Sequence, residues 1–144
     1  MSKRASLFES AESVLEAYRD ALRNCDVDTV FKLWLDDESV SCVLPNGIRL
    51  TGHVQLRTML RELLEAQPMW FEVITTTQHS TFGVAIFEAT EALHFSHEAS
   101  SKADLFVHTT YVFLQNHEGW RIAHVHCSPA AGVTIEAQMQ YAIH

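Results

Sequence analysis

The spacing at which apolar residues recur along the sequence changes once, just after Pro68. This change restricts the fold more than any other feature. Before Pro68, apolar residues recur every three or four positions, which is typical of amphipathic helices. From Met69 onward they alternate with polar residues, which is typical of strands. Helices followed by strands, without alternating βα units, predict an α+β fold whose helices lie against one face of an antiparallel sheet. The 144 residues are about the length of one domain, so we expect a single domain over residues 1–144.

Three helices are expected in the first half of the chain. They lie over residues 6–24, over a short stretch capped by Asp26 or Asp28, and over residues 53–66. Ser6 and Glu9 form a capping box, in which each side chain satisfies a backbone N–H at the start of the first helix. Between the second and third helices, residues 40–44 and 48–50 predict a small hairpin around a Pro-Asn-Gly turn.

Four strands are expected in the second half, as an antiparallel meander. They lie near residues 69–78, 82–95, 103–115 and 120–128. The last two are joined by a four-residue loop at 116–119. The tail from Ala130 is ambiguous, because its apolar residues fit either one more helical turn or an arm that binds a partner.

Charge and composition exclude several classes of protein. The net charge is −8 and no Lys/Arg stripe occurs, so nucleic acid is not an expected partner. No apolar run reaches the roughly 18–20 residues of a membrane span, and the N-terminus lacks the apolar core of a signal peptide. The three cysteines include no C-x-x-C pair, which argues against a disulfide framework or a zinc finger. We therefore expect a cytoplasmic protein without a cofactor.

The last strand carries the candidate site. Strict alternation places five side chains on its helix-facing side: Trp120, Ile122, His124, His126 and Ser128. If the hairpin pairs Gln115 with Trp120, then Tyr111 lies opposite His124 and Thr109 lies opposite His126.

These residues predict a ligand pocket. We expect Thr109, Tyr111, His124 and His126 to line it, with Tyr18 and Trp34 as walls. His126 and His124 are the candidate catalytic residues, because an imidazole can donate or accept a proton near neutral pH. The alternatives are histidines that line the pocket without catalysis, or core histidines hydrogen-bonded to their surroundings.

A metal site is weighed and not predicted. His-x-His places two imidazoles on one face of a strand, but a three-ligand site needs another His, Asp or Glu nearby. His108 falls on the other face of its strand, and the sequence leaves open which way Glu88 points.

Several segments together resemble a known superfamily. They are residues 26–34, the region 40–52, the Thr-Tyr-Val-Phe run at 110–113 and the ending G-W-R-I-A-H-V-H-C-S-P at 119–129. They are similar to nuclear transport factor two-like proteins, in particular SnoaL-like proteins and relatives of the association domain of calcium/calmodulin-dependent kinase II. The resemblance implies a cone, in which a strongly curved sheet wraps around the helices and a pocket opens at the wide end. It also implies a homodimer formed through the outer face of the sheet.

The residues give a second reason to expect a homodimer. Alternation places Ala123, Val125 and Cys127 on the outer face of the last strand, beside Val112 and Leu114 of its neighbour. Because helices can cover only one face of the sheet, this apolar face should find a partner.

The superfamily holds many activities, so function rests on the site. We expect a homodimeric domain that binds a small, partly apolar molecule. The alternatives are a lyase, isomerase or cyclase that uses His126 or His124 as general acid and base, and a dimerisation module without catalysis.

Overall fold

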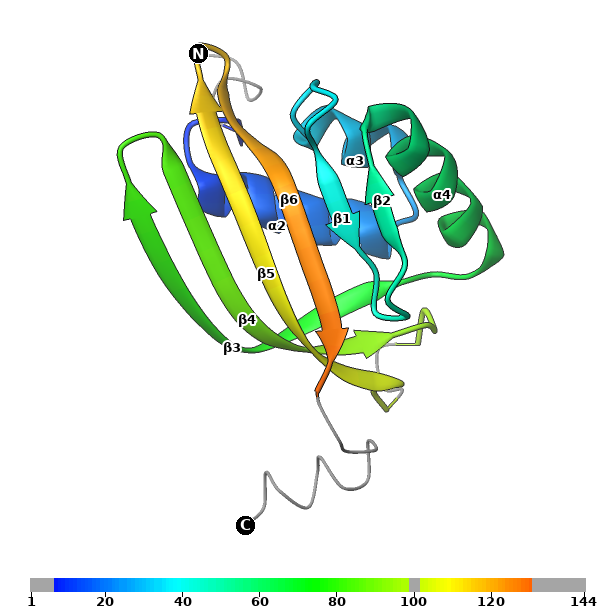
Figure 1. The fold of residues 1–144 in the computed structure, drawn as a ribbon. Coiled ribbons are helices and arrows are strands. Elements are labelled where there is room, and N and C mark those ends of the chain that lie inside the picture. The colour runs from blue at the N-terminus through cyan, green and yellow to red at the C-terminus, as the bar shows by residue number, and fades with distance from the viewer. Residues whose placement is uncertain (1–6, 99–101, 131–144) are drawn as a thin grey trace.

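The computed structural model describes residues 7–98 and 102–130, which form three helices and six strands (Figure 1). The helices are α2 (Ala11–Arg23), α3 (Val27–Leu33) and α4 (His53–Ala66). The strands are β1 (Ser41–Val43), β2 (Arg49–Thr51), β3 (Trp70–Thr81), β4 (Val84–His94), β5 (Leu105–Asn116) and β6 (Gly119–Pro129). The ambiguous tail lies almost entirely outside the described residues.

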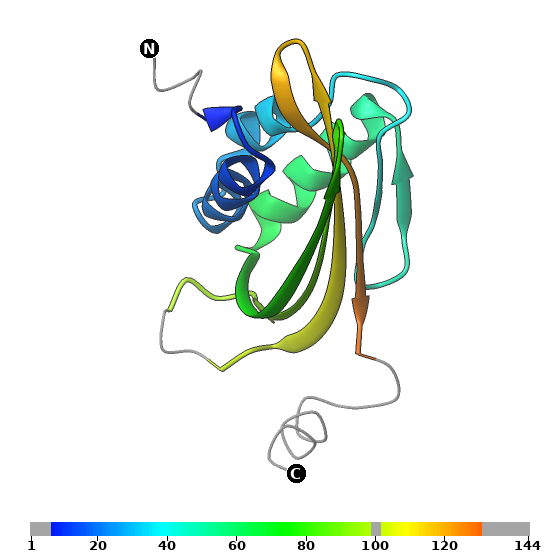
Figure 2. The ribbon, with the colours of Figure 1, turned by 90° about the vertical axis from the view of Figure 1, so that its left-hand side faces the viewer.

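The strands form one curved, unclosed sheet in the order β2-β1-β6-β5-β4-β3. All neighbours are antiparallel except β1 and β6, which are parallel. The helices lie against one face, here called the inner face, and leave the opposite, outer face uncovered (Figure 2). The predicted α+β fold and the antiparallel meander are therefore confirmed. The sequence did not predict that the small β1–β2 hairpin extends the same sheet.

Two of the three helices begin where the sequence indicates. Asp26 caps α3, because its side chain accepts a hydrogen bond from the Thr29 N–H at 3.2 Å. Helix α4 has the predicted bounds. The predicted start of the first helix is wrong: α2 begins at Ala11, and the Ser10 hydroxyl caps it by accepting from the Ser13 N–H at 3.1 Å.

The hairpin between β5 and β6 starts in the predicted register and then departs from it. Gln115 pairs with Trp120 and Phe113 pairs with Ile122, as expected. The next pair is Val112 with His124, so Ala123 is an extra residue in β6 and forms a β-bulge.

The bulge reverses the alternation for the rest of the strand. Tyr111 lies opposite Val125 and Thr109 lies opposite Cys127, so the predicted pairs of Tyr111 with His124 and of Thr109 with His126 are wrong. Val125 and Cys127 are buried on the inner face, whereas His126 is exposed on the outer face. The expected apolar outer face of β6 is therefore also wrong.

The loop of this hairpin is shorter than predicted. The strands extend to Asn116 and start again at Gly119, which pair with each other, so only two residues connect them. Among the described residues, no helix is long and apolar enough to cross a membrane.

Candidate functional site

A fully buried carboxylate, Glu91, lies on the inner face of the sheet. It belongs to β4, its exposed fraction is 0%, and the Tyr111 hydroxyl donates to its two oxygens at 2.9 Å each. Arg19 reaches it from α2 and donates to Oε2 from Nη2 at 2.8 Å and from Nε at 3.2 Å. The three residues tie helix α2 to two neighbouring strands, and we call them the Arg19–Glu91–Tyr111 centre.

The partners of Glu91 offset the cost of burying its charge. An ionised carboxylate in an apolar interior is strongly unfavourable unless it is paired and hydrogen-bonded. Arg19 supplies the opposite charge, and its guanidinium carbon also lies 5.4 Å from the centre of the Tyr111 ring. Burial, and then the Glu91 charge, raise the pKa of Tyr111 well above its usual value, so the hydroxyl remains a proton donor at neutral pH.

Two further aromatic rings extend this centre toward the second helix. The Tyr18 ring lies edge-on to Tyr111 at 6.2 Å and to Trp34 at 6.4 Å between ring centres. Burial is the main cause that raises the pKa of Tyr18 well above its usual value, and the Glu91 charge raises it further. The Tyr18 hydroxyl therefore also stays protonated.

The thiols beside the centre are not activated as nucleophiles. Burial raises the pKa of Cys42 to about 12 and that of Cys127 to about 11. A reactive cysteine needs the thiolate, which these values make scarce at neutral pH. The Thr109 hydroxyl donates to the Cys127 sulfur at 3.5 Å, so Thr109 also belongs to the interior.

The structure divides the predicted site residues between the two faces of the sheet. Tyr18, Trp34, Thr109 and Tyr111 are buried together on the inner side. His124 and His126 lie on the outer face, where the His124 Nδ1 is 2.7 Å from the Ser41 hydroxyl. The bulge at Ala123 causes this separation.

Sequence reasoning missed Glu91 and Arg19. A signal for Glu91 exists in the alternation along β4. Glu91 lies on the same face of the strand as Ala85, Phe87 and Ala89, and it is the charged residue in that apolar series. The strand residue that the sequence singled out, Glu88, is exposed on the outer face. Arg19 follows the buried Tyr18 on α2, and only its contact with Glu91 identifies it.

A groove of about 420 Å³ between α2 and the sheet leads to the centre. It is lined by Glu12, Leu15, Glu16, Arg19, Asp20, Phe71, Thr76 and Phe87. The Arg19 side chain is 20% exposed here while its guanidinium holds Glu91, so it connects the groove to the buried carboxylate. Within residues 7–98 and 102–130, no three or more His, Cys, Asp or Glu side chains are arranged to hold a metal ion.

Comparison with known proteins gives a family match and similar folds. The family model described as SnoaL-like domain matches residues 11–132. A putative dehydratase of the NTF2-like family from Streptomyces avermitilis has a TM-score of 0.76 and 22% identity over 88% of this chain and 98% of that chain. A putative calcium/calmodulin-dependent protein kinase type II association domain from Thiobacillus denitrificans has a TM-score of 0.71 and 20% identity, and the match covers 85% of this chain and 97% of that chain. A domain of unknown function with a cystatin-like fold from Nostoc punctiforme has a TM-score of 0.67 and 14% identity, and the match covers 91% of this chain and 80% of that chain. No curated protein matches the chain.

Proposed function

The chain belongs to the SnoaL-like domain family, and on that premise we propose that it binds a small molecule at the Arg19–Glu91–Tyr111 centre. The observation that carries this proposal is the complete burial of the Glu91 carboxylate. A buried ion pair is often no more stabilising than apolar residues of similar volume, so stability alone is a weak reason for placing a charge there. Charged groups held in such surroundings gather at functional sites.

The groove that leads to the centre indicates the class of ligand. Phe71 and Phe87 provide apolar contact, whereas Glu12, Glu16 and Asp20 place three carboxylates along the α2 side. These carboxylates repel an anion, and the Arg19 charge is already offset by Glu91. We infer a ligand with an apolar body that lies in the groove beside Arg19 and an uncharged or cationic polar group that faces the carboxylates of α2.

The histidines predicted from the sequence have no part in this proposal. His126 and His124 lie on the outer face, behind the sheet as seen from the groove. Tyr111 and Tyr18 are buried behind the groove lining and support the centre from the interior, and both keep their protons at neutral pH.

A thermal-shift screen tests the proposal. Ring-containing amines and alcohols are screened against the wild type, and the hits are titrated against two variants. Glu91→Gln removes the charge at the centre, and Glu88→Gln makes the same change three residues earlier on the outer face. Glu91→Gln leaves the Arg19 charge beside the groove without its counter-ion, which disfavours a cationic ligand or a hydrogen-bond donor there. A loss of about 1–2 kcal/mol would weaken binding by about 5- to 30-fold.

Glu88→Gln should leave the affinity unchanged. If Glu91→Gln binds the hits as well as the wild type does, the centre is a structural tie between α2 and the sheet and the proposal fails.

We also infer that the domain is a homodimer formed through the outer face. The helices leave this face uncovered, and Ile86, Val112 and Leu114 place half-buried apolar side chains on it. Light scattering after size exclusion should give about twice 16.3 kDa, and Val112→Asp should give the monomer mass. A wild-type protein that is monomeric at micromolar concentration would contradict this inference.

A further inference from the structure

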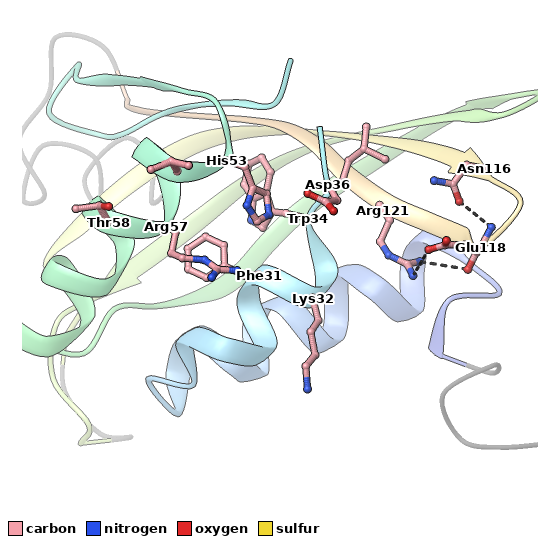
Figure 3. Close-up of a pocket in the computed structure, with 12 residues that line it drawn as sticks. Phe31, Lys32, Trp34, Asp36, His53, Arg57, Thr58, Asn116, Glu118 and Arg121 are labelled. Atoms are coloured by element: carbon pink, nitrogen blue, oxygen red, sulfur yellow. Dashed lines mark hydrogen bonds and ion pairs between the residues drawn. The ribbon is translucent and has the colours of Figure 1, made fainter. Parts of the chain in front are cut away.

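A second groove, lined in part by Trp34, has the opposite charge character (Figure 3). Its volume is about 660 Å³, within the roughly 300–1,000 Å³ typical of small-molecule sites. It lies where α3, the first turns of α4 and the β5–β6 hairpin meet. We call it the basic groove and define it by Phe31, Lys32, Trp34, His53, Arg57 and Arg121.

Positive charge gathers in this groove although the protein is acidic overall. Three of the ten Lys and Arg residues line it, in a chain whose net charge is −8. Two carboxylates, Asp36 and Glu118, also belong to the lining, and Glu118 lies 4.0 Å from the Arg121 guanidinium. The lining therefore carries one net positive charge.

Arg57 is held in place by aromatic contact rather than by a carboxylate. Its guanidinium carbon lies 5.1 Å from the centre of the Phe31 ring, and that ring meets His53 edge-on at 5.8 Å. The Arg57 side chain makes no ion pair or hydrogen bond within the described part of the chain. A guanidinium ordered on an aromatic face keeps its donors available, and it matches a carboxylate in geometry.

Trp34 supplies a donor that lacks an acceptor. Its backbone is joined to β6 through a bridge to Ile122, and its indole Nε1 is buried with no hydrogen-bond partner in the described residues. Buried N–H groups are rarely left unpaired, so each such group needs an explanation. In the close-up, Trp34 and His53 lie between Arg57 and Arg121 (Figure 3).

We propose that the basic groove binds an aromatic carboxylate, with its ring against Phe31 and Trp34 and its carboxylate on Arg57. A carboxylate only accepts hydrogen bonds when ionised, which suits the Arg57 guanidinium. This site is separate from the Arg19–Glu91–Tyr111 centre, which takes a neutral or cationic ligand. The proposal therefore does not depend on the function proposed for that centre.

Titration with 2-naphthoate, followed through the indole N–H signals in ¹H–¹⁵N spectra, tests the proposal. The three tryptophans give three signals, which Trp→Phe variants assign. The Trp34 signal should shift in a saturable way. The Trp70 signal should stay in place, because its Nε1 already donates to the Ser96 carbonyl at 2.6 Å.

Matched ligands and variants make the test specific. The uncharged 2-naphthamide should bind at least about fivefold more weakly than 2-naphthoate, and Arg57→Gln should weaken 2-naphthoate binding to a similar degree. Arg61→Gln, one turn further along α4 and outside the groove lining, should leave binding unchanged. Glu91→Gln should also leave it unchanged, which separates this site from the buried centre.

Three results would overturn the proposal. They are a Trp34 signal that does not move at millimolar 2-naphthoate, equal binding of 2-naphthamide, and equal effects of Arg57→Gln and Arg61→Gln. Thermal melts of each variant establish that it is folded before the titration is interpreted.

Discussion

Replacing Arg19 by methionine should destabilise the protein severely, because it leaves the Glu91 charge buried without its counter-ion. Methionine retains an unbranched apolar stem and removes the guanidinium that donates to Glu91 at 2.8 and 3.2 Å. The carboxylate has no exposed surface, so water cannot replace the lost donors, and the Tyr111 hydroxyl is its remaining partner. Breaking a buried ion pair by removing one partner costs about 3–5 kcal/mol.

The loss is large compared with the total stability of a domain, about 5–15 kcal/mol. Urea unfolding at pH 7, followed by circular dichroism, should show a lower midpoint and an unchanged slope. Adding Glu91→Gln to Arg19→Met removes the unpaired charge and keeps an acceptor for the Tyr111 hydroxyl. The double variant should therefore recover more than half of the lost stability, which a loss of packing at Arg19 would not allow.

Arg61→Met is the matched control. Arg61 lies 3.8 Å from Asp28, and both side chains are largely exposed, at 47% and 85%. Exposed ion pairs contribute about 0–1 kcal/mol, so this change should be nearly neutral. If Arg19→Met costs no more than Arg61→Met, then Glu91 is not a buried charge that depends on Arg19, and the description of the centre is wrong.

Three further variants test other parts of the structure. Tyr111→Phe removes a hydroxyl that donates to a carboxylate, so it should cost about 1.5–3 kcal/mol and lower Tm by roughly 5–10 °C, measured by calorimetry. Burial, and then the neighbouring His126, lower the pKa of His124, so the unfolded chain binds more protons and stability should fall as pH drops below about 6.5. His124→Gln should flatten this pH dependence of urea midpoints. Gly119→Ala should destabilise far more than Gly47→Ala: both positions have positive φ, but a Cβ at Gly119 comes within 2.5 Å of the Phe8 carbonyl oxygen, whereas Gly47 faces open space. Equal melting temperatures for the two alanine variants would contradict this.

Local patterns in the sequence were sufficient for most of the secondary structure. Asp26 as a cap and the bounds of α4 follow from short-range signals, namely a side-chain acceptor at the helix start and a proline beyond its end. The change of apolar period predicted the helices, the four long strands and their order. Burial of Tyr18 and Tyr111 also follows from periodicity, because each lies on the apolar face of its own element.

Tertiary structure alone decided which side of the sheet carries the chemistry. The sequence prediction assigned each β6 side chain to a face by counting residues from the hairpin. One extra residue at Ala123 reverses that assignment for every position that follows. Nothing in the local sequence marks that bulge, so His124 and His126 were predicted on the wrong face.

The buried carboxylate likewise depends on a residue that lies far from it in the sequence. Parity places Glu91 on the apolar face of β4, but its ion pair joins residues 72 positions apart in the sequence. An unpaired charge is too costly to bury, so a glutamate at this position stays on the inner face only if a counter-ion reaches it. That counter-ion is Arg19, which only the folded chain brings to Glu91. The sequence therefore determined the elements and their apolar faces, whereas the packing of α2 on the sheet determined the polar centre between them.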